Sequence, residues 1–332
     1  MIDNEDKKGD FSFRGQSHQD AWAEMTYAGA LSFLRRRYSR DLQGVDVAVL
    51  GVAFDQATTN RSGARLGPRA IRAASTQLAE LKTYPLGLSL HEHLSIIDYG
   101  DVYLDSGYPD KMVEKVMATA THLFNHDVKP LSLGGDHFIS YPLIKAAAAK
   151  YGPLSLVHFD AHCDTWPDDG TRLDHGSMFA RAAKEGLIEP SRSVQIGLRT
   201  WNDDDYGFHI FDANHVHQGD LQAIGGQIID IIGHHPAYLT VDIDCLDPAF
   251  APGTGTPVAG GLSSQQLLSL LQIIGGFPAN KHEARLPSLQ IIGADVVEVA
   301  PAYDISEITA IAAATIAQSI LIHWALDSMC DG

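Results

Sequence analysis

The sequence predicts an α/β protein, namely a three-layer α/β/α sandwich around a central parallel sheet. Seven short apolar runs are continuous rather than alternating, as in strands that are covered on both faces. Segments with helical periodicity lie between these runs, and no break in composition divides them. We therefore expect a single domain over residues 45–332, preceded by an N-terminal arm over residues 1–44.

The arm contains one stretch with a helical pattern, around residues 22–38, and the predicted strands begin after it. They are expected at residues 45–51, 94–98, 130–134, 153–160, 193–198, 237–244 and 289–299.

Helices are predicted between the strands. Apolar residues between 113 and 124 share one helix face, after a cap at Asp110. A second helix is expected over residues 267–274, because Ser263-x-x-Gln266 matches a capping box. The polar stretch 280–287 is expected to form a surface loop.

The last predicted helix has nearly the length of a membrane span. Residues 308–326 carry no formal charge, but most are alanine and several are polar. Asp304-x-x-Glu307 precedes them as a second capping box, in which Asp304 would accept from the N–H three residues on. We therefore predict a buried helix of a soluble protein and no membrane association.

The composition limits the classes of partner. The 332 residues include 41 Asp and Glu against 24 Lys and Arg, which gives a formal net charge of −17. A chain this acidic will not bind nucleic acid through a general basic surface, and it favours small cationic substrates. Three cysteines cannot build a disulfide framework, and the N-terminus has no apolar signal segment, so we expect a cytoplasmic protein.

Acidic and histidine residues follow three of the predicted strands, at the edge where parallel sheets bind their ligands. The three segments are Gly134-Gly135-Asp136-His137, Asp160-Ala161-His162-Cys163-Asp164 and Asp242-Ile243-Asp244. Because side chains alternate in an extended backbone, Asp160, His162 and Asp164 can face the same side.

Four carboxylates at the edge of an apolar sheet need compensating positive charge, and two divalent cations would supply it. The predicted ligands are His137, Asp160, His162, Asp164, Asp242 and Asp244. Oxygen and imidazole donors favour Mn²⁺, with Ni²⁺, Co²⁺ or Zn²⁺ as alternatives. Such a pair can hold a hydroxide that attacks a phosphate ester, an amide or an amidine.

Glu298 follows the last apolar run and narrows the choice among these three substrate classes. A carboxylate at another strand end can form a two-pronged pair with a guanidinium. An acid beyond those needed for the metals suits a cationic substrate and does not suit a phosphate. Without the metal site, a salt-bridged core acid would be the first interpretation of Glu298.

Other polar residues near the motifs have structural interpretations. Asp136 and Asp247 are expected as hydrogen-bonding loop or turn residues. Cys163 and Cys245 should point away from the ligands and pack in the core. The close histidine pairs 91/93, 215/217 and 234/235 lack neighbouring ligands, so we expect them on the surface or in loops.

The motifs together resemble the ureohydrolase (arginase/agmatinase) family, and within it the agmatinases. The matching stretches are GVAFD (51–55), RSGARLGPRAIR (61–72), SLGGDHF (132–138), VHFDAHCDTW (157–166), LDHGSMF (173–179), YLTVDIDCLDPAFAPGTGTP (238–257) and GADVVEVAPAYDISEITA (293–310).

The resemblance implies an arginase-like catalytic domain, two manganese ions bridged by a hydroxide, and a homo-oligomer that is a trimer or hexamer. It implies one metal held by His137, Asp160, Asp164 and Asp242, and another held by His162, Asp160, Asp242 and Asp244. It also implies that Asp164 passes a proton to the departing amine, that His175 shuttles protons and that Glu298 anchors the guanidinium.

The substrate implied is a small guanidino compound, with agmatine, hydrolysed to putrescine and urea, as the first choice. Residues 165–174 lack the arginase pattern and carry Asp168 and Asp169, which suit an amine-ended tail. Guanidinobutyrate, guanidinopropionate and arginine remain as alternatives. So do hydrolysis of a different C–N bond by the same centre and a catalytically silent scaffold of the same family.

Overall fold

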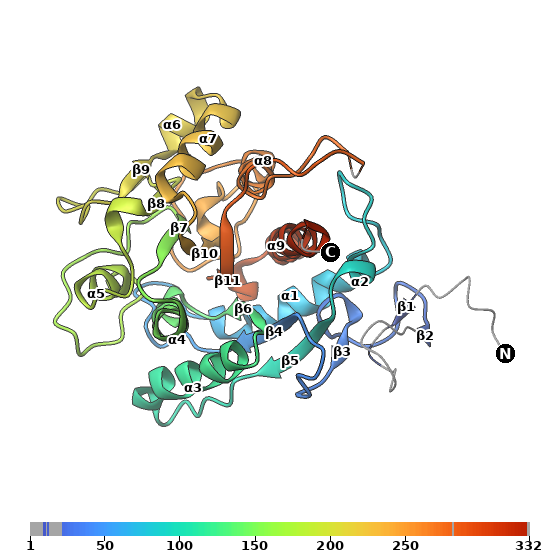
Figure 1. Cartoon of the computed structure of the whole chain (residues 1–332). Coiled ribbons are helices and arrows are strands. Elements are labelled where there is room, and N and C mark those ends of the chain that lie inside the picture. The colour runs from blue at the N-terminus through green and yellow to red at the C-terminus, as the bar shows by residue number, and fades with distance from the viewer. Residues whose placement is uncertain (1–8, 11, 13–21, 281, 331–332) are drawn as a thin grey trace.

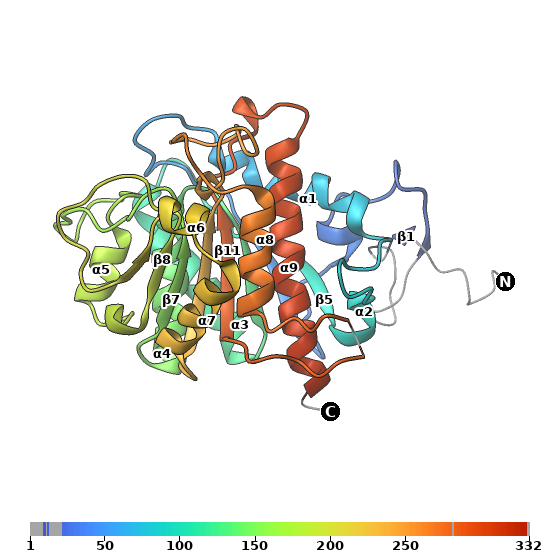
Figure 2. The same cartoon turned by 90° about the horizontal axis from the view of Figure 1, so that it is seen from above.

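The computed structural model describes residues 9–10, 12, 22–280 and 282–330. Its main feature is a nine-stranded sheet in which all neighbouring strands are parallel (Figures 1 and 2). In spatial order the strands are β3 (Arg37–Tyr38), β5 (Ile96–Asp101), β4 (Val47–Val52), β6 (Lys129–Gly134), β11 (Gln290–Val297), β10 (Pro236–Asp242), β7 (Ser155–Phe159), β8 (Val194–Ile196) and β9 (His209–Phe211). The fold class is the predicted one.

Helices cover both faces of this sheet. One face packs against α1 (Gly67–Ser75), α2 (Leu90–His93), α6 (Ala213–Gln218), α7 (Leu221–Ile232), α8 (Ser264–Ile274) and α9 (Ile308–Cys330). The other packs against α3 (Met112–Asn125), α4 (Ser140–Tyr151) and α5 (Met178–Lys184).

Alternate residues of each central strand enter the two cores. Val47 and Val49 of β4 lie in the core under α1 and α9, whereas Ala48 and Leu50 lie in the core under α3 and α4. This two-sided burial explains why the strands are continuously apolar in sequence. All seven predicted strands are present, and the two further strands of this sheet, β3 and β9, are short strands at its edges.

The prediction of a helix over residues 22–38 is wrong. This stretch contains β2 (Trp22–Ala23), which pairs with β1 (Gly9–Asp10), then a 3₁₀ turn at Phe33–Arg35, and then β3. The N–H of Phe33 donates to Asp98, and the N–H of Leu34 donates to Ser75, so distant side chains take the bonds that a helix would use. Part of the predicted arm thus reaches the edge of the main sheet.

Two of the three predicted caps differ from expectation. Ser263 and Gln266 form the capping box of α8 as predicted. Asp110, however, lies in a 3₁₀ turn and does not cap α3. Asp304 accepts from the N–H groups of residues 309 and 310, at 3.0 and 3.1 Å, because α9 begins one residue beyond Glu307, which has a φ of +61°.

Helix α9 lies inside the protein. Its length and apolar composition suffice for a membrane span, but 78% of its most apolar 18-residue window is buried. It packs against α1, α8 and β11, and the indole of Trp324 donates to the carbonyl of Ile291 at 2.9 Å. The helix is therefore a core element of the sandwich.

Candidate metal centre

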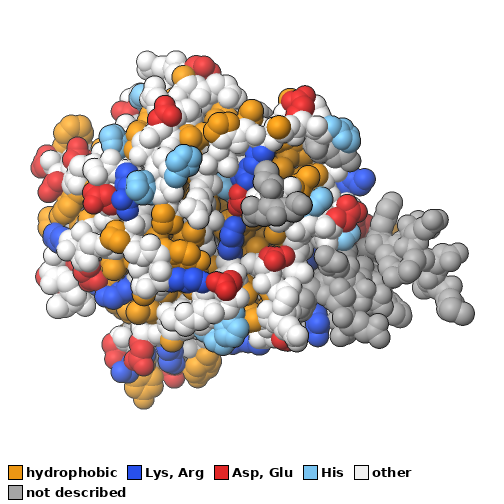
Figure 3. All heavy atoms as spheres, viewed as in Figure 1, with side chains coloured by type: hydrophobic (Ala, Val, Ile, Leu, Met, Phe, Trp, Pro, Cys, Tyr) orange, Lys and Arg blue, Asp and Glu red, His pale blue; other side chains and the backbone are white. Residues whose placement is uncertain are grey.

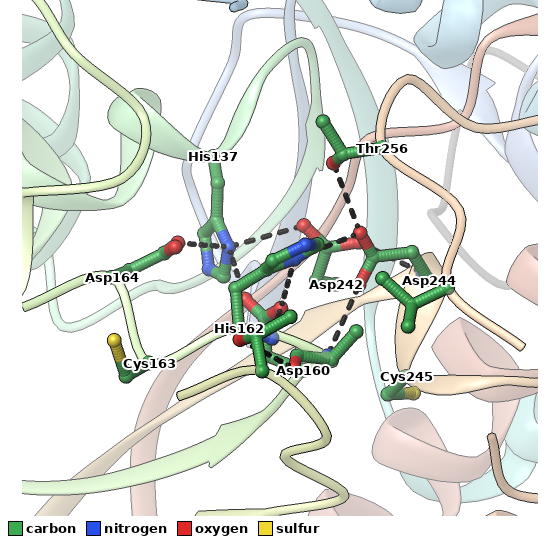
Figure 4. Close-up of polar contacts among 12 residues, drawn as sticks. His137, Asp160, His162, Cys163, Asp164, Asp242, Asp244, Cys245 and Thr256 are labelled. Atoms are coloured by element: carbon green, nitrogen blue, oxygen red, sulfur yellow. Dashed lines mark hydrogen bonds and ion pairs between the residues drawn. The ribbon is translucent and has the colours of Figure 1, made fainter. Parts of the chain in front are cut away.

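The six predicted ligands converge (Figure 4), and they come from the carboxyl ends of three central strands, β6, β10 and β7. His137 opens the turn after β6; Asp160, His162 and Asp164 follow β7; Asp242 ends β10 and Asp244 lies in the next turn. The turn that carries His137 passes close to the end of β4 and requires Gly135, because a Cβ there would lie 2.0 Å from the carbonyl oxygen of Phe54.

His137 lies at the middle of the first group of ligands. Its Nδ1 is 3.0 Å from Asp160 Oδ2, 3.1 Å from Asp164 Oδ2 and 3.2 Å from Asp242 Oδ2. Donor atoms bound about 2.1 Å from one metal ion are about 3 Å from each other. The spacing of these four atoms therefore fits a shared cation.

The hydrogen bond of His137 Nε2 identifies Nδ1 as the ring atom that faces a metal. Its Nε2 lies 2.8 Å from Thr240 Oγ1, and that hydroxyl donates to Asp295 Oδ1 at 2.5 Å. Since the hydroxyl proton is used toward Asp295, Nε2–H of His137 must be the donor to Thr240. Burial alone would lower the pKa of His137, but the hydrogen bonds to Asp160, Asp164 and Asp242 outweigh it and raise the pKa well above its usual value. Without metal, Nδ1 therefore holds a proton, and a cation would replace that proton and bind the lone pair.

The second group centres on His162. Its Nδ1 lies 3.2 Å from Asp160 Oδ1 and 3.2 Å from Asp244 Oδ2. Asp244 is held by the backbone N–H of Ala161 at 3.1 Å and by Thr256 Oγ1 at 3.1 Å. Asp160 contributes one oxygen to each group, as a carboxylate shared between two cations would.

Without metal the cluster retains protons. Burial alone would lower the pKa of His162, but the charge of Asp244 and the hydrogen bond to Asp160 outweigh it and raise the pKa to about 12. Burial raises the pKa of Asp242, and the charges of Asp244 and Asp160 raise it further. Bound cations would replace these protons.

Glu298 lies beside the first group with one oxygen fixed and the other free. Oε1 accepts from the backbone N–H of His137 at 2.9 Å and from His175 Nδ1 at 2.8 Å. Oε2 is buried and has no hydrogen-bond partner among the described residues. Glu298 (φ +64°) and Asp164 (φ +51°) both have left-handed backbones, a strained conformation for these residues that is common at functional sites.

His175 is positioned between Glu298 and Thr59. The N–H of Thr59 donates to Nε2 at 3.1 Å, so the proton of the neutral ring lies on Nδ1 and points at Glu298. Burial alone would lower the pKa of His175, but the hydrogen bond and charge of Glu298 outweigh it and raise the pKa to about 9. The charged form of the ring is therefore favoured near neutral pH.

Asp168 does not have the expected role. Its two oxygens accept from Arg181 Nε at 2.7 Å and from Arg181 NH2 at 2.8 Å, and its side chain is 2% exposed. This buried two-pronged pair leaves no oxygen for a substrate amine. Asp169 is exposed and accepts from the N–H and hydroxyl of Thr171.

The structure agrees with the structural interpretations of Asp136, Asp247, Cys163 and Cys245. Asp136 accepts from the N–H groups of residues 57 and 138, and Asp247 accepts from those of residues 249, 260 and 261. Cys163 and Cys245 are buried free thiols. None of the three histidine pairs belongs to the two potential metal clusters found within the described ranges. The pair 91/93 departs from the expected surface or loop position, because both residues are half-buried in α2.

Sequence reasoning missed the residues behind the ligands. His158, whose Nε2 is 2.7 Å from Asp160 Oδ2, is enclosed in an apolar run and looks like a core residue. Its position two residues before Asp160, on the same side of the strand, was the available signal. Thr240 and Asp295 were likewise hidden inside strands.

Comparisons with known proteins agree with this geometry. A sequence model of the arginase family matches residues 45–323. An agmatinase from Chromobacterium violaceum is 53% identical over 315 residues, which cover 94% of each chain. The crystal structure of a hypothetical agmatinase from Burkholderia thailandensis aligns with a TM-score of 0.92 at 54% identity, over 98% of this chain and 99% of that one.

A more distant relative has a similar fold, and its name gives a different substrate. The proclavaminate amidino hydrolase from Streptomyces clavuligerus aligns with a TM-score of 0.83 at 35% identity, over 91% of this chain and 99% of that one. From the family match over most of the chain and the identity to these relatives, we conclude that this protein belongs to the arginase family.

Proposed function

We propose that this protein hydrolyses agmatine to putrescine and urea. As a member of the arginase family it is a metal-dependent amidine hydrolase. The observation that carries the choice of a guanidine is the free, buried Oε2 of Glu298 beside the ligand cluster. A buried carboxylate oxygen without a partner is costly unless a cationic donor reaches it.

The ligand roles are part of this proposal. His137, Asp160, Asp164 and Asp242 would hold one manganese ion; His162, Asp160, Asp242 and Asp244 would hold the other. Divalent cations lower the pKa of water enough to provide a nucleophile at neutral pH. Ni²⁺, Co²⁺ or Zn²⁺ are the alternatives, because carboxylate and imidazole donors also bind these ions.

The remaining residues would bind the substrate and move protons. Glu298 Oε2 would accept the guanidinium and orient its carbon. When water adds to that carbon, Asp164 would take its proton and give it to the departing amine as the C–N bond breaks. His175 would exchange protons with solvent through Nε2. The balance is one water and one agmatine consumed, with one urea and one putrescine formed.

The choice of agmatine, with its amine-ended tail, is supported by the relatives and by the net charge of the chain rather than by Asp168. Relatives at 47–53% identity are agmatinases, and the formal net charge of −17 favours a cationic substrate over an acidic one. On the described part of the face in Figure 3, Lys and Arg side chains are scattered among acidic and uncharged ones rather than joined in one basic surface.

A substrate panel tests the proposal. Urea release from manganese-loaded protein should be fastest with agmatine, and slower with arginine, guanidinobutyrate and guanidinopropionate. Faster turnover of an acid-tailed guanidine would contradict the choice of agmatine. A silent scaffold would release urea from none of them. We further propose a cytoplasmic homo-oligomer, a trimer or hexamer, which size-exclusion chromatography with light scattering would test.

A further inference from the structure

We propose that His158 and Gln195 are positioning residues that hold the Asp160 carboxylate between the two cations, with His158 acting as an N–H donor and not as a ligand. The inference rests on the proposed metal centre and adds two residues to it. It assigns a reason for two fully buried polar side chains that the ligand set does not use.

The two residues occupy adjacent strands directly behind the cluster. His158 of β7 and Gln195 of β8 are paired in register, and both are completely buried. His158 Nε2 lies 2.7 Å from Asp160 Oδ2, and its Nδ1 lies 3.0 Å from Gln195 Nε2. The ring also packs edge-on against Phe179, with the centroids 4.6 Å apart.

A main-chain carbonyl fixes the direction of this chain of hydrogen bonds. Gln195 Nε2 lies 2.6 Å from the carbonyl oxygen of Cys163, which can only accept. The NH₂ group of Gln195 must therefore face both Cys163 and His158. The opposite orientation of the amide would place Gln195 Oε1 against the carbonyl oxygen of Cys163. His158 Nδ1 is then the acceptor from Gln195.

The proton of His158 consequently lies on Nε2 and points at Asp160. A nitrogen that carries a proton has no lone pair for a metal. A charged ring would also direct Nδ1–H at the NH₂ group of Gln195. His158 is thus excluded as a ligand, although its ring nitrogen lies close enough to the donor atoms of His137, Asp160 and Asp164 to share a cation with them.

Asp160 is the residue that needs this support, because it touches both histidine ligands. Its Oδ1 accepts from the backbone N–H of His162 at 2.6 Å, and its Oδ2 accepts from His158. One N–H on each oxygen prevents rotation of the carboxylate and leaves the other lone pairs for the cations. Partners that orient a ligand in this way commonly change metal affinity by about 10–100-fold when removed.

The test compares two substitutions of His158 by manganese binding rather than by turnover alone. His158→Gln can keep an N–H near the position of Nε2, whereas His158→Leu keeps bulk without a donor. Isothermal titration calorimetry with Mn²⁺ should show about 10–100-fold weaker binding for His158→Leu, and binding within about threefold of wild type for His158→Gln. Circular dichroism and thermal melting would establish that each variant is folded.

The outcomes separate this inference from the proposed function. Wild-type affinity in a folded His158→Leu variant would overturn the positioning role. Equal and large losses in both variants would indicate a ligand and overturn it as well. Wild-type protein that binds no manganese would contradict the proposed function too.

A second measurement avoids mutation altogether. In metal-free wild-type protein labelled with ¹⁵N-histidine, long-range ¹H–¹⁵N spectra should show the His158 proton on Nε2. A proton on Nδ1, or on both nitrogens, would overturn the inference even if the leucine variant failed to fold.

Discussion

The proposed role of Glu298 depends on the position of one free carboxylate oxygen. Its fixed Oε1 is bonded to the backbone of His137 and to the ring of His175, so the free Oε2 has a defined position relative to the ligands. A neutral side chain of the same shape would keep the fixed bonds only in part and would lose the charge that attracts a guanidinium.

Replacing Glu298 with glutamine should therefore impair substrate use. We expect kcat/KM for agmatine to fall by about 100-fold or more, since a hydrogen bond between charged groups contributes about 1.5–3 kcal/mol and burial increases its effect. Steady-state urea release measures the change, with the surface variant Glu114→Gln as the matched control. Unchanged kcat/KM in Glu298→Gln would instead favour hydrolysis of a different C–N bond.

Asp168 should behave as a stability residue and not as a specificity residue. Asp168→Asn breaks a buried pair with Arg181, so the melting temperature should drop, in keeping with a loss of about 3–5 kcal/mol. KM for agmatine should stay within about twofold of wild type. The exposed neighbour provides the control, because Asp169→Asn should change neither quantity much. A selective rise in KM for Asp168→Asn would restore its role in binding the amine tail.

At the scale of elements, the sequence predicted those strands and helices whose apolar residues follow a regular local pattern. The seven central strands were predictable because both faces of each are buried, and the strand-end acids followed from the topology of parallel sheets. The stretch 22–38 was not predictable, because Asp98 and Ser75, which are distant in sequence, take its N–H groups. Arg181, the partner of Asp168, likewise lies on another element, and short edge strands have too few residues to show a period.

Helix α9 contains a buried histidine that should make stability depend on pH. His323 donates from Nε2 to the carbonyl of Leu289, and burial lowers its pKa to about 4; Arg285 and Lys129 lower it, and Asp327 opposes them. As the pH falls from about 6.5 toward 4, the unfolded chain binds a proton that the folded protein does not. Folding should lose about 3 kcal/mol over this window and nothing above it.

The variant His323→Gln isolates this contribution. Thermal melting at pH 7.5 and pH 5 should show a smaller loss for the variant than for wild type, because glutamine cannot gain that proton. Equal losses in both proteins would show that His323 does not contribute to the pH dependence.

At the scale of the whole molecule, the proposed metal centre joins three segments that are far apart in sequence. Residues 137, 160–164 and 242–244 meet only when β6, β7 and β10 lie in the observed sheet, so folding and metal binding should be linked. The residues that lie behind the predicted ligands, such as His158, Gln195 and Asp295, could not be identified from sequence because they look like ordinary polar interruptions of buried strands.

Metal removal should accordingly lower the stability of the protein. A ligand at 100 times its Kd stabilises the folded state by about 2.7 kcal/mol per site. Differential scanning calorimetry should show a melting temperature that falls by several degrees after chelation and recovers with Mn²⁺. Chelated protein with an unchanged melting temperature would mean that the cluster folds equally well without cations.

The most direct test of the two-metal claim is an anomalous difference map from manganese-soaked crystals, with data collected on either side of the manganese absorption edge. We predict two peaks, one beside His137 Nδ1 and one beside His162 Nδ1, with Asp160 between them. A single peak, or none at these strand ends, would contradict the account.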